Sequence, residues 1–299
     1  MANEMARQAR RTGLGAWHLI KETYHDWSQD KVMTQGAALA YYAVFSLAPL
    51  LIIIMAVTGF FLGKQTSRTT IMNYLQQSMG PSASGYIDGL LKAAYPQGSE
   101  GLAAIIGVII LLLGATSVFV MLTQTLNLIW KVGPERSGLA KLVLTRLLGL
   151  ALLLLIGVLL FLSVILSTAV HAMAATLTTV IAIPAVAFLI AEAVISFLVI
   201  TVLFALIYKL LPDAAIAWRD IWIGALVTAM LFSAGKYGLG LYLGRSSVGS
   251  AYGAAGSLVV ILLWIYYSAQ IFLLGAEFTQ VYARTYGSRG KTEEAVPVG

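Results

Sequence analysis

The sequence predicts an all-α membrane protein that crosses the bilayer with six helices. Three observations support this: 59% of the 299 residues are hydrophobic, only 11% are Asp, Glu, Lys or Arg, and the apolar residues gather into six long runs. A bilayer core of about 30 Å needs about 20 apolar residues in a helix. Backbone amides in hydrocarbon must bond within their own segment, and the runs lack the alternation of a transmembrane β-strand. Each run is therefore expected to be a helix.

The first 33 residues precede these runs and have a different pattern. Leu14, Trp17, Ile20, Tyr24 and Trp27 recur at spacings of three and four between charged positions. Such spacing predicts a cytoplasmic amphipathic helix, which either lies on the inner membrane surface or packs under the bundle. The six runs then occupy a transmembrane domain within residues 34–284, at 35–62, 101–130, 139–170, 180–211, 221–243 and 252–282. The polar residues 285–299 are expected to form a disordered cytoplasmic tail.

Residues 64–100 form the one long segment between the first two runs. They contain two apolar stripes of helical period, separated by Gly80-Pro81, which is a typical helix break. The stripes are Ile71, Tyr74, Leu75 and Met79, then Tyr86, Ile87, Leu90, Leu91 and Ala94. We expect two short helices that cap the outer mouth of the bundle. A structural cap is favoured over a gate.

The distribution of basic residues predicts the orientation. Cytoplasmic segments of membrane proteins carry an excess of Lys and Arg. If both termini are cytoplasmic, the chain places only four basic residues on the outer side: Lys64, Arg68, Lys92 and Arg245. The expected topology is thus that of a multi-pass membrane protein with its N- and C-termini in the cytoplasm.

Composition also excludes several function classes. The net charge of +6 reflects basic residues scattered along the cytoplasmic edges, so a nucleic-acid partner is not expected. Without cysteine there are no disulfides or thiolate metal sites, and three separated histidines do not form a metal site. No motif of a soluble enzyme is present, so we expect no enzyme, no metal and no cofactor. The spacing Gly240-x-x-x-Gly244 favours close helix packing instead.

Two ionisable residues lie within the predicted membrane helices. Glu192 is near the middle of the fourth run, and Lys236 is about two-thirds across the fifth. An ionised carboxylate at mid-membrane costs about 2.5–3.5 kcal/mol on insertion scales, so Glu192 needs a proton, a partner or water. One hypothesis is a substrate or proton site, with Lys236 as the partner. The equal alternative is an ion pair that holds helices in register.

Polar residues also form stripes on three other runs. Tyr42 shares a helix face with Gln35 and Ser46, and Asn127 shares one with Thr116 and Thr123. Gln270 and Glu277 share a face of the last run with Tyr266. Each stripe alone favours bonding between helices. Together they indicate a polar interior path.

Several short motifs resemble the YihY/virulence factor BrkB family of bacterial inner-membrane proteins, over about residues 30–285. The first-helix match is Gln35-Gly36-Ala37-Ala38-Leu39-Ala40-Tyr41-Tyr42, with Ser46 and Pro49. The others are Leu126-Asn127-Leu128-Ile129-Trp130, Tyr208-Lys209-Leu210-Leu211-Pro212, Trp218 with Gly224-Ala225, and a block containing Tyr252-Gly253-Ala254, Leu263-Trp264-Ile265-Tyr266 and Gly275-Ala276-Glu277.

The resemblance implies a six-helix inner-membrane protein connected with serum resistance, export of lipid-A precursors and envelope integrity. Members of that family have also carried a ribonuclease label. We do not transfer that activity, because the sequence has no soluble nuclease domain and no acidic or histidine metal cluster on the cytoplasmic side.

The sequence therefore leads to one main hypothesis and one alternative. The main one is a transporter or flippase-like protein for an amphipathic or anionic envelope molecule, either a lipid or a small solute. Its pathway would be built from Tyr42, Asn127, Glu192, Lys236, Gln270 and Glu277. The alternative is a non-transporting scaffold of the cell envelope, in which the buried charges are structural. The expected partners are membrane lipids and this substrate, and a homo-oligomer is left open.

Overall fold

The computed structural model describes residues 2–79, 81–94, 102–133, 138–180, 185–245 and 255–289. These residues are almost entirely helical and contain no strand. The helices are α1 (Ala2–Gln29), α2 (Val32–Leu62), α3 (Lys64–Met79), α4 (Pro81–Ala94), α5 (Leu102–Ile129), α6 (Leu139–Val180), α7 (Ala185–Leu210), α8 (Trp218–Arg245) and α10 (Gly256–Thr285). The predicted all-α fold class is confirmed.

Four helical segments are long and apolar enough to cross a membrane. They are Leu112–Ile129 of α5, Val186–Leu210 of α7, Trp218–Tyr242 of α8 and Gly256–Thr285 of α10. A fifth is the bent pair Val32–Leu47 and Pro49–Phe60, which together make up most of α2. In α6 the described apolar stretch, Val143–Leu159, is shorter. The chain is thus a helical membrane protein, although the described residues do not confirm the count of six.

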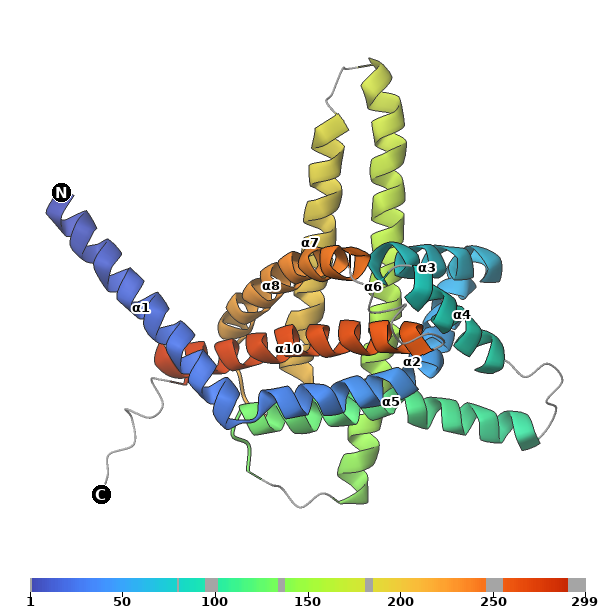
Figure 1. The fold of residues 1–299 in the computed structure, drawn as a ribbon, viewed down its shortest axis with the longest axis horizontal. Helices are drawn as coiled ribbons and strands as arrows, with labels where there is room; N and C mark the ends of the chain where they lie inside the picture. The colour runs from blue at the N-terminus through green and yellow to red at the C-terminus, as the bar shows by residue number, and fades with distance from the viewer. Residues whose placement is uncertain are drawn as a thin grey trace.

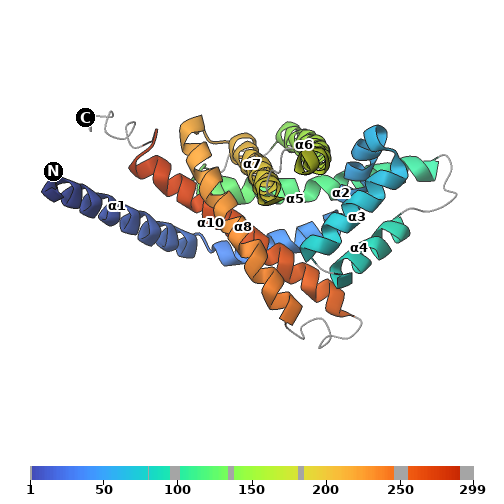
Figure 2. The same ribbon diagram turned by 90° about the horizontal axis from the view of Figure 1, so that it is seen from above.

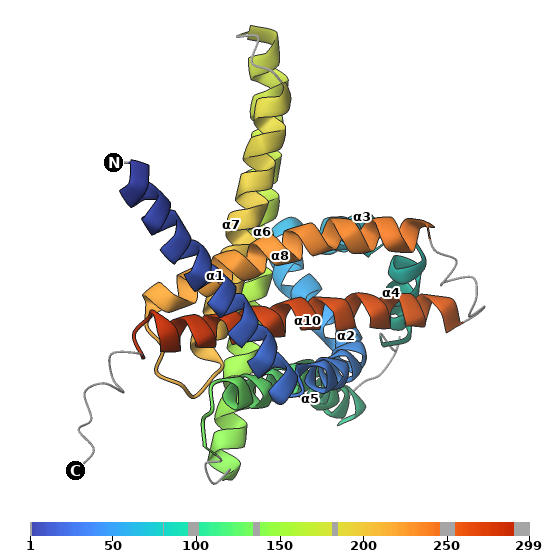
Figure 3. The same cartoon turned by 60° about the vertical axis from the view of Figure 1, so that its left-hand side comes forward.

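The long helices form two sets that cross one another (Figure 1). Helix α10 packs between α8 and α2, and α5 packs against α2. The pair α6 and α7 stands across these helices and extends well beyond them, which Figures 1 and 3 both show. Seen from above, α1 lies at the opposite end of the molecule from α3 and α4 (Figure 2).

Helix α6 is longer than its apolar pattern predicts. We expected a helix over 139–170, and the helix continues to Val180. Residues 171–180 are rich in Ala and Thr and contain no Gly or Pro, so nothing in that stretch ends the helix. At 1.5 Å per residue, its 42 residues span about 63 Å, roughly twice the thickness of a bilayer core.

Helix α2 is broken near its middle. Its halves, Val32–Leu47 and Pro49–Phe60, meet at 53°. Proline lacks the amide hydrogen and its ring clashes with the preceding turn, which explains a kink at Pro49. Helix α5 fits against this bend through Gly114, where an added Cβ would lie 3.2 Å from the Pro49 ring. A small residue of α5 therefore packs against the bend in α2.

Helix α1 has one face packed against the bundle and one face exposed. Each of the two alternatives for the first 33 residues described one of these faces. Thr23 and Asp26 are buried where α1 packs on α10, and Trp27 packs against the main hydrophobic core. The other face exposes Trp17, Ile20 and Tyr24. An outward aromatic face of this kind is typical of helices at a membrane surface.

The cap helices α3 and α4 lie at the far end from α1, as two helices broken at Gly80-Pro81. Helix α4 buries Ile87 and Leu91 against Leu51 of α2 and Val260 and Ile261 of α10. The two cap helices are tied together by Asp88 of α4, which accepts hydrogen bonds from Arg68 of α3 and pairs with Lys92 at 2.7 Å.

This charged cluster predicts how the cap responds to acid. The Lys92 ammonium and then the Arg68 guanidinium hold the pKa of Asp88 below its ordinary value of 3.8. A lowered pKa stabilises the folded state above the ordinary value, and the contribution is lost as the pH falls through the folded value. We expect α3 to loosen from α4 only below about pH 4, and Asp88→Asn to loosen it at every pH.

Because the chain has no cysteine, a single label on Gln76→Cys can report this by fluorescence anisotropy. Loosening that already begins at pH 6, or an unchanged signal in Asp88→Asn, would argue against the cluster.

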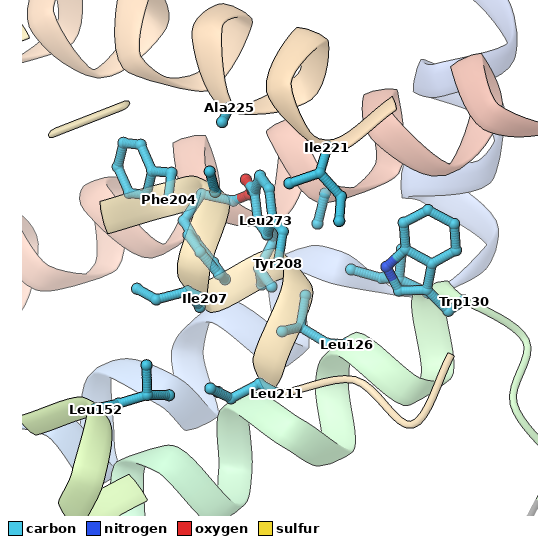
Figure 4. Packing of buried hydrophobic residues seen from close by; sticks show 14 of the residues in the cluster. Leu126, Trp130, Leu152, Phe204, Ile207, Tyr208, Leu211, Ile221, Ala225 and Leu273 are labelled. Atoms are coloured by element: carbon cyan, nitrogen blue, oxygen red, sulfur yellow. The ribbon is translucent and has the colours of Figure 1, made fainter. Parts of the chain in front are cut away.

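The core of the molecule forms where α5, α7, α8 and α10 meet. Figure 4 shows Tyr208 of α7 directed between Ile221 and Ala225 of α8 and Leu273 of α10. The Tyr208 hydroxyl donates to the Phe272 carbonyl at 2.6 Å and lies 3.0 Å from the Thr228 hydroxyl. A wholly buried tyrosine thus has both apolar packing and a partner for its hydroxyl group.

Helices α8 and α10 approach each other closely at two glycines, one on each helix, and each glycine faces a threonine of the other helix. A Cβ on Gly224 of α8 would lie 1.8 Å from the Thr279 hydroxyl oxygen, and one on Gly275 of α10 would lie 1.9 Å from that of Thr228. Each threonine donates to the carbonyl of the glycine four residues before it in its own helix. Small residues that let helices approach closely are a common packing device in membrane proteins.

Candidate functional site

The six predicted pathway residues do not converge on one site. Tyr42 of α2 is exposed and packs edge-on against Tyr41. Asn127 of α5 is bonded to the loop between α7 and α8: its amide donates to the Asp213 carboxylate at 2.7 Å, and its oxygen accepts from the Asp213 backbone amide at 2.8 Å. Both residues therefore have local structural contacts.

Glu192 lies on α7 and Lys236 lies on α8. Both are partly exposed. Among the described side chains no ion pair joins them; the Lys236 ammonium instead lies 5.6 Å from the ring centroid of Tyr74 on α3. Glu192 has an interaction of its own. The described side chains thus make no contact that supports the hypothesis that Lys236 neutralises Glu192.

The remaining two residues, Gln270 and Glu277, lie on one face of α10 toward the start of α2 and the end of α1. The Gln270 amide donates to the Met33 carbonyl at 3.3 Å. A Cβ on Gly36 would lie 2.1 Å from that amide nitrogen, so Gly36 makes room for Gln270. Seven residues further along α10, Glu277 is completely buried.

Glu277 is an unusual residue for a membrane-spanning helix. Neither of its carboxylate oxygens has a hydrogen-bond partner. It is faced by Asp26 and Asp30, from α1 and the turn after it, and by Lys131 from the end of α5. An ionised carboxylate is costly to bury unless it is paired and hydrogen-bonded, and buried polar groups rarely lack partners. The site around Glu277 is therefore chemically incomplete.

Several ion pairs lie around Glu277, in a region that we call the α1–α10 junction. It comprises Glu22, Thr23, Asp26 and Asp30 with Trp130, Lys131, Glu277, Gln280, Arg284 and Arg289. Arg284 donates to Glu22 at 2.9 Å and to Asp26 at 3.2 Å. Lys131 pairs with Asp30. Helix α1 is thereby attached to α10 and to the end of α5, which Figure 3 shows in side view.

The junction also contains functional candidates that the sequence did not reveal. The Thr23 hydroxyl, the Trp130 indole nitrogen and the Gln280 amide oxygen are all buried without a partner. Asp26 and Asp30 appear in the sequence as ordinary charges of an amphipathic helix. One available signal was the spacing of Thr23, Asp26 and Asp30, which places them on one face opposite Trp17.

A small pocket opens beside the junction, where the turn after α10 folds back on the start of α8. Its volume is about 160 Å³, and it is lined by Ala217, Arg219, Asp220, Tyr286, Gly287 and Ser288. Asp220 is buried but satisfied, because it accepts hydrogen bonds from the backbone amide and hydroxyl of Ser288. Residues 286–289 are thus folded against the helices. Residues 290–299 of the predicted tail lie outside the described part of the chain.

Comparison with known proteins gives the family. The sequence matches the family described as "Virulence factor BrkB" over residues 23–297, which is most of the chain. The chain belongs to the BrkB family. This confirms the resemblance seen in the sequence motifs. No solved structure matches the fold.

Curated relatives from the BrkB family carry the name UPF0761 membrane protein. One from Stenotrophomonas maltophilia is 29% identical over 87% of this chain and 59% of its own length. Another, from Ralstonia nicotianae, is 30% identical over 83% of this chain and 55% of its own length. A relative from Aeromonas salmonicida is 26% identical over 88% of both chains. The chain thus spans about three-fifths of the length of the first of these relatives.

The motifs that resembled the BrkB family meet in space. Tyr208, Gly224 and Gly275 come from three separate motifs, and they pack together at the crossing of α7, α8 and α10. Glu277 follows two residues after Gly275, Asn127 lies in the last turn of α5, and Trp130, which follows α5, belongs to the junction. The motif residues therefore build one helix contact and the polar region next to it.

Proposed function

We propose that this BrkB family protein is a non-enzymatic transporter or flippase-like protein that moves an amphipathic or anionic molecule of the cell envelope. It would lie in the bacterial inner membrane with both termini in the cytoplasm. Its partners would be membrane lipids and a lipid or anionic solute as substrate.

The observation that supports transport most is Glu277. A carboxylate that is fully buried in a candidate membrane span, with no donor on either oxygen, carries an energetic penalty that a purely structural helix would not need. Intramembrane ionisable residues commonly mark substrate or ion pathways. The α1–α10 junction therefore replaces the Glu192–Lys236 pair as the centre of the proposed site.

The broken helix α2 gives a second reason. Discontinuous helices occur in transporters because their interrupted backbone lines binding sites and permits one part of the bundle to rock. The first half of α2 begins at Val32, two residues after Asp30, so a change at the junction acts on the segment before the 53° bend.

A scaffold function remains the second candidate because of the ion pairs that attach α1. Arg284 with Glu22 and Asp26, and Lys131 with Asp30, would fix α1 as a docking platform. A scaffold of this kind predicts that the protein moves no molecule across a membrane.

The direct test is reconstitution of the purified full chain in liposomes. The probes are a zwitterionic and an anionic fluorescent phospholipid, followed by quenching from outside, and a trapped anionic dye. We expect at least one probe to cross about tenfold faster than in protein-free vesicles, which corresponds to about 1.4 kcal/mol of barrier. If all three probes cross at the protein-free rate, the scaffold is the better account.

A further inference from the structure

The α1–α10 junction contains more negative than positive charge. Its carboxylates are Glu22, Asp26, Asp30 and Glu277, and its cations are Lys131, Arg284 and Arg289. Arg284 and Lys131 neutralise the carboxylates of α1 and the turn after it. The Arg289 guanidinium lies over the Trp130 ring at 5.2 Å and donates to the Trp130 carbonyl. Counting all three cations leaves one negative charge without compensation.

The unpartnered polar atoms of the junction are mainly oxygens, with the Trp130 indole nitrogen as the exception among the described residues. Besides the two oxygens of Glu277, the amide oxygen of Gln280 and the hydroxyl oxygen of Thr23 have no partner, and all three residues are at most 5% exposed. The polar side chain within hydrogen-bonding reach of Glu277 is Asp30, another carboxyl group. Lys131 donates to both oxygens of Asp30, so the carboxylate that is left without a bonded partner is Glu277.

Other charged groups near Glu277 are already engaged. Asp26 is held by Arg284, and Glu22 is held by Arg284 and lies 3.4 Å from His18. Lys31 is exposed. Helix α2 begins at this level with the apolar residues Val32 and Met33. None of these contacts satisfies Glu277.

We propose that the junction binds one monovalent cation, a proton or a sodium-sized ion, between Glu277 and Asp30, with Gln280 as a neutral oxygen ligand. One positive charge balances the charge of the junction and gives the buried oxygens a partner. Carboxylate and amide oxygens are the ligands that hard cations prefer.

The site extends the proposed function, because the cation would be the coupling ion for transport. Only this coupling role rests on the proposed function. Asp30 lies between α1 and α2, while Glu277 belongs to α10. A cation that joins them would hold the start of α2 against α10, and its release would free that contact. Binding itself can be measured without transport.

The test uses the full chain in detergent. Its Tm is measured as sodium replaces choline at constant ionic strength and pH 8, and then across pH 5–9 in choline alone. A ligand that binds only the folded state stabilises it by mass action, so a hundredfold excess over Kd raises Tm by about 5 °C. We expect such a rise in at least one series. A rise with sodium that weakens at low pH identifies sodium, whereas a rise only on acidification identifies a proton.

Glu277→Gln assigns the response to this site. The neutral amide removes the uncompensated charge, so we expect the variant to lose the sodium or pH response. The matched control is Asp220→Asn, an equally buried acid that is already hydrogen-bonded, and it should keep the response. If Glu277→Gln fails to fold, equilibrium dialysis of the wild-type chain with radioactive sodium, and proton release on sodium addition, give the same information.

Two results would overturn the proposal. One is a wild-type Tm that is indifferent to sodium and changes with pH no more than that of Glu277→Gln, which would leave a bound water as the occupant. The other is a response that Glu277→Gln retains in full. Cation binding without movement of any probe in liposomes would instead refute transport alone, and probe movement without cation binding would refute the site alone.

Discussion

Replacing Gly275 with leucine is expected to prevent α8 and α10 from packing and to lower the free energy of unfolding by about 3 kcal/mol or more. Even a Cβ at this position would lie 1.9 Å from the Thr228 hydroxyl oxygen and 2.7 Å from that of Tyr208. Neither group can move aside easily, because Thr228 donates to the Gly224 carbonyl and Tyr208 donates to the Phe272 carbonyl. The clash must therefore separate the helices.

Gly240→Leu is the matched control for this prediction. It lies on α8, and a Cβ there would meet no heavy atom within 4 Å. Both variants are compared with the wild type by the yield of monodisperse protein and by Tm in detergent. If Gly275→Leu unfolds at the wild-type temperature, the close approach of α8 and α10 is wrong.

Replacing Trp130 with alanine is expected to cost about 3–5 kcal/mol of stability, in the range of large aromatic truncations in a core. Trp130 is 1% exposed and packs in the main hydrophobic core, with Arg289 over its ring. Its removal would leave a cavity at the end of α5 and release the turn after α10. The region that positions Lys131 next to Asp30 would lose its support.

Trp218→Ala provides the comparison, because Trp218 also lies below a cation, Lys209, at 5.6 Å but is 47% exposed. We expect that variant to lose less than about 1 kcal/mol. Chemical unfolding monitored by circular dichroism would measure both changes. Equal losses in the two variants would show that burial of Trp130 is not what stabilises the junction.

Much of the helical framework was predictable because its signal is local. Long apolar runs predicted α2, α5, α7, α8 and α10 within a few residues, and Gly80-Pro81 predicted the break between the cap helices. Gln270 and Glu277, which the sequence placed on one face of α10, both lie toward the start of α2 and the end of α1. Hydrophobic periodicity determines such features without knowledge of neighbouring helices.

The sequence could not predict which helices meet. Glycine spacing favoured close packing at Gly240, but Gly240 faces open space, and the close contacts are at Gly224 and Gly275. A glycine reveals its role only through the residue on the facing helix. Likewise, Glu192 stood out because it is an acid within an apolar run, whereas the importance of Asp30 depends on Glu277, 247 positions later in the sequence. Such pairs arise from tertiary structure.

In the proposed function, the buried charge of Glu277 serves transport. This is tested by the rate at which the probes cross liposomes that contain equal amounts of folded wild-type or Glu277→Gln protein, with Asp220→Asn as control. We expect at least a tenfold lower rate for Glu277→Gln, close to that of protein-free vesicles, with Tm maintained or raised. Equal rates for wild type and Glu277→Gln, or a variant whose only defect is a lower Tm, would contradict it.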